Sequence, residues 1–229
     1  MLPIHDLNAL LAQVAPHMYT DAYDLLPPLN GVLLETDASH LYAVATDRYS
    51  FAIARTRPAR ERGAIPAAQR WRALLSPADL RALRTMRPLA AEEPAELDYR
   101  PGRQLEIRIG EQTLRTADRS EKAERFPNWR SLLAQTLERE PELPDDLALN
   151  PTYLARWSKG IPRQDRYVPL TVWATGAGKP IVFARGEDFI GLQMPVTREP
   201  SDDQPTGREA VRHAWAADAT AAEPHRAAA

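Results

Sequence analysis

Apolar residues recur at helical spacing in three short stretches of the chain, each beginning close to a proline. The stretches are LPIHDLNALLAQV, LLSPADLRALRTM and ALNPTYLARWSKG, and their prolines, Pro3, Pro77 and Pro151, lie 74 residues apart. Proline suits the first helical position because an amide hydrogen there would have no partner within the helix. Ser76 and Asn150 directly precede two of these prolines and are favourable N-cap residues. The spacing therefore predicts three helix starts on one internal repeat.

Each predicted helix is followed by three short segments in which apolar and polar residues mostly alternate. Gly, Pro, Asp or Asn bounds most of these segments, as is typical of strands. The segments are GVLLETD, HLYAVAT and SFAIART after the first helix, AELDYRP, QLEIRIG and QTLRTAD after the second, and VPLTVWAT, KPIVFAR and FIGLQMPV after the third. A further strand is expected before the second helix, in RWRALL, and before the third, in DLAL.

These elements predict an α+β fold of about three repeated β-α-β-β-β units, the first with a missing or shortened leading strand. The pattern leaves one alternative open, a single α+β domain in which the spacing is a coincidence. Beyond Thr197 the sequence is polar, contains prolines and is rich in alanine. Residues 198–229 are therefore predicted to form a disordered tail, with a transient helix from about Arg208 to Ala217.

The composition narrows the classes of function. The 229 residues are 44% hydrophobic, enough to bury a core, and their 29 basic and 31 acidic side chains give a net charge of −2. Any contact with DNA therefore requires a local basic surface. There are no cysteines, and the five histidines lack HxxxH or HExxH spacing, so no disulfide and no metal site is expected. With no apolar run of about eighteen residues and no signal-peptide pattern, we expect a cytoplasmic protein without membrane contacts.

Motifs that resemble catalytic sequences do not fit their patterns. TGAGKP would need glycine in place of Trp173 and serine or threonine in place of Pro180 to form a phosphate-binding loop, so a turn between strands is expected. The carboxylate pairs at 145–146 and 202–203 lie in predicted loop or tail. Because no nucleophile is placed with a base, the sequence predicts no enzyme and no cofactor.

Four stretches resemble the bacterial DNA polymerase III β sliding clamp family in order and character. They are LNGVLLETDASHLYAVATDRYSFAIAR, ERFPNWRSLL, LNPTYLARW and KPIVFARGEDFIGLQMPV, and the resemblance covers roughly residues 3–197 in pieces. It implies that residues 1–121 form a complete clamp-like domain of two units. Residues 122–144 would then be an interdomain linker, and residues 145–197 one further unit of a partial domain.

In that family, three two-unit domains form a subunit, and subunits close head to tail into a ring around duplex DNA. The resemblance implies that the family's first domain and the leading half of its last domain, which form the usual ring interface, have no counterpart in the given residues. A chain of three units could still complete a twelve-unit ring as a tetramer. The resemblance thus implies a homo-oligomer as one hypothesis and a monomer as the other.

The resemblance also implies a cleft that binds short peptide motifs of polymerases and other partners. Such clefts combine apolar pockets with a few polar groups, and a flexible methionine suits varied partners. The family usually has glycine where Arg48 stands, arginine where Ser50 stands and a basic residue where Ser131 stands. The alternative is that Phe51 and the other apolar members fill an interdomain core. The implied cleft residues are Thr46, Arg48, Tyr49, Ser50, Phe51, Pro127, Ser131, Leu132, Gln193, Met194, Pro195 and Val196.

A second candidate site is a basic surface that faces DNA. Arginines recur every three residues on the predicted second helix, and basic residues fall on one flank of the predicted third, as on the helices that line the channel of the family's rings. Contacts of this kind to phosphates would be independent of sequence and sensitive to salt. The alternative is a solvated helix face. The predicted DNA-facing residues are Arg81, Arg84, Arg87, Arg156, Lys159 and Arg163.

Three functional hypotheses follow. The first is a clamp-like, non-catalytic binding protein of DNA replication or repair that engages DNA polymerase or other proteins with clamp-binding motifs. Its contact with duplex DNA would be non-specific. The second is a clamp mimic from a phage or mobile element, a decoy that sequesters clamp-binding partners without encircling DNA. The third, an enzyme on an unrelated α+β fold, would need clustered ionisable groups in a pocket.

Overall fold

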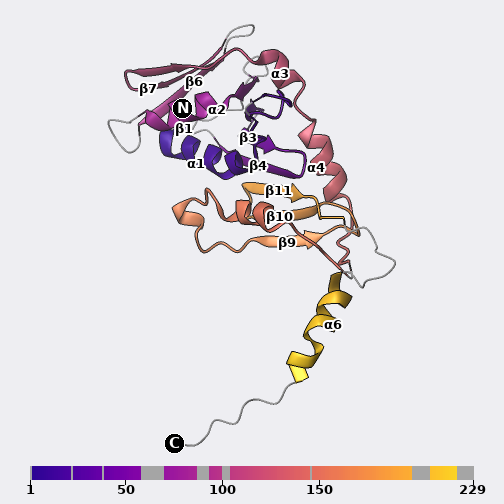
Figure 1. The fold of residues 1–229 in the computed structure, drawn as a ribbon. Helices are drawn as coiled ribbons and strands as arrows, with labels where there is room; N and C mark the ends of the chain where they lie inside the picture. Colours follow the sequence, from indigo (N-terminus) through magenta and orange to yellow (C-terminus); the bar gives the residue numbers. More distant parts are fainter. Residues whose placement is uncertain are drawn as a thin grey trace, which may run out of the picture.

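The computed structural model describes residues 2–21, 23–37, 39–57, 70–86, 93–99, 104–144, 146–197 and 207–220. Within these residues the chain forms two antiparallel sheets, one of four strands and one of seven, together with short helices (Figure 1). The predicted α+β class is confirmed. No described helix has both the length and the apolar character needed to cross a lipid bilayer.

The three predicted helix starts are confirmed. α1 follows Pro3, while α2 and α5 begin at Pro77 and Pro151. At α2 the cap is a reciprocal pair, because the Asp79 amide donates to the Ser76 hydroxyl and the Ser76 amide donates to the Asp79 carboxylate. The helices are α1 (Ile4–Val14), α2 (Pro77–Thr85), α3 (Ser120–Glu124), α4 (Trp129–Leu137), α5 (Pro151–Leu154) and α6 (Gly207–Thr220), with 3₁₀ turns η1 (Ala15–His17), η3 (Ala155–Ser158) and η4 (Arg163–Asp165).

Three strands follow α1, α2 and α5 in turn, as predicted. We call β1, α1 and β2–β4 the first unit, β5, α2 and β6–β8 the second, and α5 to β11 the third. The strands are β1 (Leu2–Pro3), β2 (Val32–Thr36), β3 (Leu41–Thr46), β4 (Ser50–Thr56), β5 (Arg72–Leu75), β6 (Pro94–Tyr99), β7 (Leu105–Ile109), β8 (Gln112–Arg115), β9 (Thr171–Ala174), β10 (Ile181–Arg185) and β11 (Phe189–Gln193).

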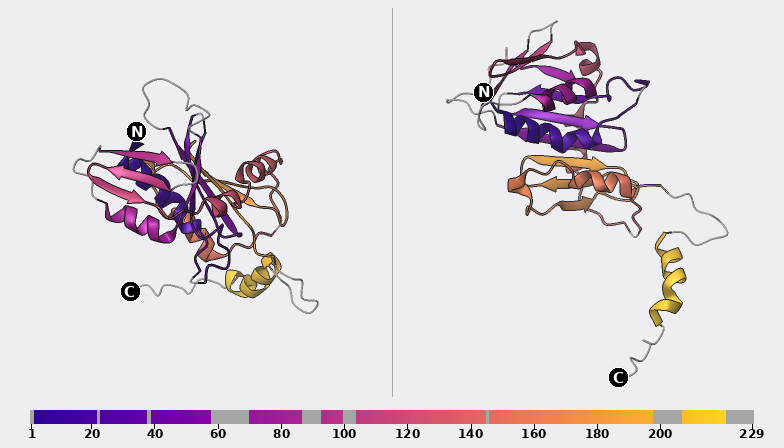
Figure 2. Two further views of the ribbon diagram at one scale, coloured as in Figure 1. Left: turned by 90° about the horizontal axis from the view of Figure 1, so that it is seen from above. Right: turned by 60° about the vertical axis from the view of Figure 1, so that its left-hand side comes forward.

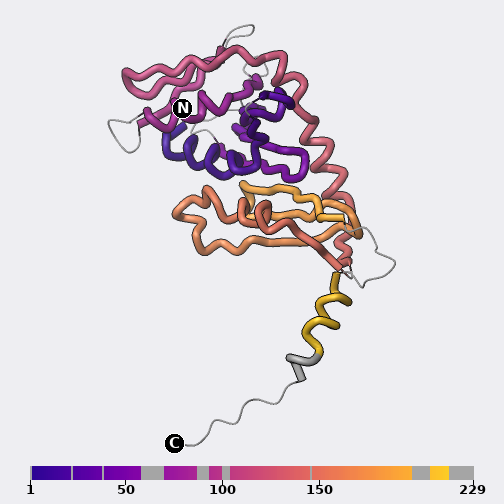
Figure 3. Tube along the Cα trace, in the orientation of Figure 1, coloured from indigo at the N-terminus to yellow at the C-terminus, as the bar shows by residue number. Residues whose placement is uncertain are grey.

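The sheets join the units by exchanging strands. The short β1 pairs with β6 of the second unit, and β5 of the second unit pairs with β2 of the first. The seven-stranded sheet has the order β5-β2-β3-β4-β11-β10-β9, so the third unit extends the sheet of the first through β11 and β4. Figure 3 follows the chain between them, through α3 and α4 along one side of the molecule. We call the contact between the first and third units the junction.

Two predictions about the third unit are wrong. DLAL forms no strand; instead Glu142, a few residues earlier, makes an isolated parallel bridge to Thr175. The third helix is also shorter than predicted, since α5 passes into η3 and the helical backbone ends at Ser158. Gly160 follows with a φ of +65°, a backbone conformation that ends helices.

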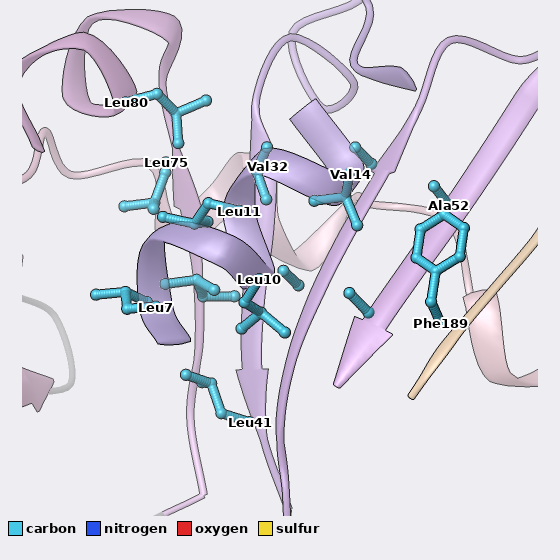
Figure 4. Close-up of a cluster of buried hydrophobic side chains, with 14 of the residues drawn as sticks. Leu7, Leu10, Leu11, Val14, Val32, Leu41, Ala52, Leu75, Leu80 and Phe189 are labelled. Carbon is cyan, nitrogen blue, oxygen red and sulfur yellow. The ribbon is translucent and has the colours of Figure 1, made fainter. Parts of the chain in front are cut away.

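Each face of the seven-stranded sheet has its own core. On one face α1 packs between the strands and the four-stranded sheet, and Figure 4 shows Leu7, Leu10, Leu11 and Val14 among the strand side chains. On the other face, Phe126 and Trp129 pack against the strands. Phe126 lies just before α4, and Trp129 is the first residue of that helix. Side chains alternate along a strand, so each strand of this sheet contributes to both cores.

The C-terminal segment contains a helix of 14 residues. Where the sequence predicts a disordered tail with a transient helix, the structure has α6 over Gly207–Thr220, and the rest of 198–229 lies outside the described residues. Alanine-rich sequence favours this conformation. Figures 1 and 2 show α6 extending away from the two sheets. The side chains of Val211 and Trp215 on this helix are exposed.

Candidate functional site

The turn between β3 and β4 is built around one carboxylate. Oδ1 of Asp47 accepts hydrogen bonds from the amides of Tyr49 (3.0 Å) and Ser50 (2.8 Å) and from the Ser50 hydroxyl (3.1 Å). The Thr46 hydroxyl donates to the carbonyl of Ser50 at 2.8 Å. Aspartate side chains commonly close turns by binding backbone amides a few residues ahead. The turn therefore has a defined conformation, with Arg48 and Tyr49 exposed at its tip.

Arg48 occupies a backbone conformation that favours glycine, the residue that the resemblance expects there. Its φ is +83°, where an L side chain is strained by about 1–2 kcal/mol. We expect Arg48→Gly to raise the free energy of unfolding by about 0.5–1 kcal/mol, because relief of strain outweighs the added freedom of glycine in the unfolded chain. Chemical denaturation measures the change. Arg48→Ala, which keeps a Cβ, should give no comparable gain, and equal effects of both variants would contradict this account.

The structure brings the turn together with the end of β11. Ser50 pairs with Gln193 in the sheet, and the Met194 amide donates to the carbonyl of Tyr49 at 2.8 Å. Two residues further on, the Val196 amide donates to the carbonyl of Ala148 at 2.9 Å. Residues distant in sequence thus lie next to each other at the junction.

The predicted cleft residues divide into exposed and buried side chains. Tyr49, Met194 and Val196 are 56%, 38% and 46% exposed, and Arg48 is exposed beside them. We call these four residues, with the partly exposed Pro195, the recognition surface. A group of exposed apolar side chains of this kind is suited to binding another molecule.

The side chains of Thr46, Ser50, Phe51 and Gln193 are buried. Phe51 lies in the core beneath α4, in the same cluster as Leu192, as the core alternative expects. Gln193 is on the opposite face of the sheet, where its Oε1 accepts a hydrogen bond from Nε1 of Trp157 at 2.6 Å. Ser50 points to the same face as Gln193, because side chains alternate along β4 and the next residue, Phe51, points to the other face. Ser50 and Gln193 therefore shape the site from inside and present no side chain to solvent.

The three predicted linker residues are exposed around the start of α4. Pro127 precedes the N-cap residue Asn128, whose side chain accepts a hydrogen bond from the Ser131 amide. Leu132 is 38% exposed, while its neighbour Leu133 packs into the cluster that contains Phe51. The linker thus lies over the sheet face that includes Phe51, with Leu132 at its solvent side.

The predicted basic surface is only partly formed as expected. Arg81 and Arg84 are exposed on α2, whereas Arg87 lies outside the described residues. Lys159 and Arg163 are exposed, but they do not share a helix with Arg156, because Lys159 is the C-cap of η3 and Arg163 begins η4. The prediction of one basic flank on the third helix is therefore wrong.

Arg156 lies in a polar contact that sequence reasoning missed. Its Nη1 is 2.5 Å from Oδ2 of Asp47 and 2.9 Å from the Ser50 hydroxyl. Its guanidinium lies 4.2 Å over the ring of Tyr153, and that ring stacks on Tyr49 at 5.9 Å. Spacing from Asp47 to Ser50 could have indicated the turn, but no local pattern indicates a partner 109 residues away.

A buried histidine lies behind the turn, at the junction. The ring of His17 is fully buried, 4.3 Å from the ring of Trp157. Burial, followed by the nearby positive charge of Arg156, lowers the pKa of His17 to about 3. His17 is therefore neutral near pH 7 and acts as an aromatic packing group there.

Comparison with known proteins identifies the fold. No protein-family model matches the chain, and no curated protein matches its sequence significantly. Solved structures do match. The β subunit of DNA polymerase III from Thermotoga maritima has a TM-score of 0.59 at 15% identity, with 88% of this chain and 65% of that chain covered. The DNA polymerase sliding clamp from Bacillus subtilis gives 0.58 at 15% identity, with 86% and 64% covered.

The β subunit from the DNA polymerase of Streptococcus pyogenes is similar at the same level, with a TM-score of 0.58, 17% identity and coverage of 86% of this chain and 65% of that one. This chain thus spans about two thirds of the length of the clamps that it matches. The chain has the fold of the bacterial DNA polymerase III β sliding clamps.

Proposed function

We propose that this protein is a clamp-like, non-catalytic binding protein of DNA replication or repair, and that the recognition surface takes linear peptide motifs of polymerase-type partners. The clamp fold supports the class of function. The observation that supports the site is the hydrogen bond from Met194 to Tyr49, which aligns exposed side chains of the first and third units.

The chemistry of the recognition surface fits a peptide with spaced apolar anchors. Tyr49 offers a rigid ring, and Met194 a flexible thioether that adapts to different side chains. Leucine and phenylalanine anchors would bury against these groups and against Leu132, while exposed polar groups of the turn set the register of the peptide. Arg48 adds a positive charge at the edge, so this surface differs from one with glycine at that position.

Met194→Ala tests the site. We expect a peptide with spaced leucine and phenylalanine anchors to bind the full chain, and the variant to bind it about tenfold more weakly, because truncation of a central anchor residue typically costs 1 kcal/mol or more. Isothermal titration measures both affinities. Val172→Ala, an exposed apolar residue on β9, is the control and should bind like the unaltered protein. Failure of the peptide to bind at high micromolar concentration, or equal affinity of Met194→Ala, would contradict the assignment.

The second part of the proposal is that an oligomer of this chain encircles duplex DNA. The exposed basic residues Arg81, Arg84, Lys159 and Arg163 support it as non-specific phosphate contacts. We expect a molar mass in solution that is a multiple of the monomer mass, as measured by light scattering with and without DNA. We also expect the protein to be retained on circular DNA and released when that DNA is linearised. A monomeric mass in both cases, together with peptide binding, would favour the decoy hypothesis instead.

A further inference from the structure

Arg156 is the one predicted DNA-facing residue, among those that the structure describes, whose side chain is mostly withdrawn from solvent. The side chain is 19% exposed, and that of its partner Asp47 is 8% exposed. A guanidinium held in this way is less available to a phosphate than the exposed cations of the same segment. The position of Arg156 therefore indicates a role in contacts within the protein rather than in contacts with DNA.

The Asp47 carboxylate connects Arg156 to the recognition surface. One oxygen accepts from the amides of Tyr49 and Ser50, and the other accepts from Arg156. The carbonyl of Tyr49 in turn accepts from the Met194 amide. A continuous series of hydrogen bonds thus runs from Arg156 through the turn to the segment that holds Met194 and Val196.

The other end of this series is anchored in the core of the third unit. Arg156 is followed by Trp157, which is buried, stacks on Phe183 at 4.4 Å and donates to Gln193. η3 therefore has little freedom to move relative to β10 and β11. Because η3 is fixed, the position of Arg156 sets the position of the Asp47 carboxylate, and with it the conformation of the turn.

Arginine suits this arrangement better than lysine. The same Nη1 contacts both Asp47 and the Ser50 hydroxyl, while the planar face of the guanidinium lies over the Tyr153 ring. Lysine has a compact charge that cannot stack in this way. Tyr153 in turn stacks on Tyr49. Through Tyr153, the Arg156 side chain therefore also orders the exposed Tyr49 ring of the recognition surface.

We propose that Arg156 is a positioning residue that holds the recognition surface in its binding conformation and couples peptide binding to the docking of the third unit. This inference rests on the proposed function of that surface. If the order of the turn and the docking of the third unit are coupled, the coupling is reciprocal. A peptide that binds the ordered turn more tightly must therefore also stabilise the junction.

The test compares Arg156→Gln with Arg166→Gln in the full chain. Glutamine removes the charge and the stacking group, and Arg166 is an exposed arginine of the same unit that lies outside the recognition surface. Two quantities are measured, peptide affinity and the hydrogen exchange rates of the amides of Asp47, Tyr49, Ser50 and Met194. For Arg156→Gln we expect about tenfold weaker peptide binding and about tenfold faster exchange, as for a coupling of ordinary size. Arg166→Gln should change neither.

A second variant separates positioning from stability, since Arg156→Gln leaves a buried carboxylate without its counter-charge. In Asp47→Asn with Arg156→Gln, the asparagine oxygen can still accept from the turn amides while the unpaired charge is gone. We expect the unfolding temperature to recover and peptide affinity to stay low, because the tie to η3 is still missing. Full recovery of affinity along with stability would overturn the proposal.

The outcomes also separate this inference from the proposed function. Unchanged exchange at the four amides in Arg156→Gln overturns the positioning role, whether or not the peptide binds. If the unaltered protein binds no peptide, the proposed function fails, and the exchange rates alone then decide whether Arg156 orders the surface.

Discussion

Trp157→Ala is expected to lower the free energy of unfolding by about 4 kcal/mol, the range seen when large buried aromatic residues are truncated. Trp157 is 2% exposed and contacts the rings of His17, Phe183 and Phe189. Its indole also donates to the buried amide oxygen of Gln193, which the variant would leave without this donor. Both the cavity and the lost hydrogen bond lie at the junction. Chemical denaturation monitored by circular dichroism measures the loss.

Trp215→Ala is the matched control for this prediction. Trp215 is on α6 and is 65% exposed, so its removal should change the free energy of unfolding by less than about 0.5 kcal/mol. A loss below about 1 kcal/mol for Trp157→Ala would show that the third unit does not depend on this side chain for its docking.

Gly160→Ala is expected to destabilise the protein by about 3 kcal/mol for two reasons that add. The residue has a φ of +65°, which is strained for an L side chain. A Cβ at this position would also lie 2.0 Å from the carbonyl oxygen of Ala12 and 2.8 Å from the amide nitrogen of Gln13, both in the backbone of α1. Because neither backbone can move without separating the third unit from the first, the contact must be relieved at the junction.

Gly178→Ala isolates the backbone contribution. Gly178 has a similar φ of +67°, but a Cβ there would meet no atom within 4 Å. We expect a loss of about 1 kcal/mol for this variant, from backbone strain alone. Urea denaturation of both variants gives the difference, and equal losses would contradict a close approach between Gly160 and α1.

Local elements were predictable because their causes are local. Ser76 and Asp79 satisfy amides of the same helix end, so the start of α2 could be recognised from four residues. The strands could be recognised because alternation along a few residues reflects a sheet with distinct faces. The predicted strand in DLAL was wrong, since a strand needs a partner and the isolated bridge of this region forms at Glu142 instead.

The candidate site is one neighbourhood in the structure, but the roles of its side chains differ. The turn lies beside Met194, whereas Ser50 and Gln193, which the resemblance grouped with them, are buried. Alternation shows which residues share a face, but only the packing of η3 on the sheet shows which face is covered. The domain boundaries and the peptide and DNA contacts stay predictions.

By itself, the sequence determined the three helix starts on the repeat, the three strands that follow each of them and the α+β class, because capping, periodicity and turn formation act over a few residues. It did not indicate α3 and α4. Only the tertiary structure decided that β11 would extend the first unit through β4, that Trp157 and Gly160 would meet α1 and its surroundings, and that Arg156 would bind Asp47. These contacts join residues separated by more than a hundred positions. Their geometry depends on how whole units dock, and no local pattern records that.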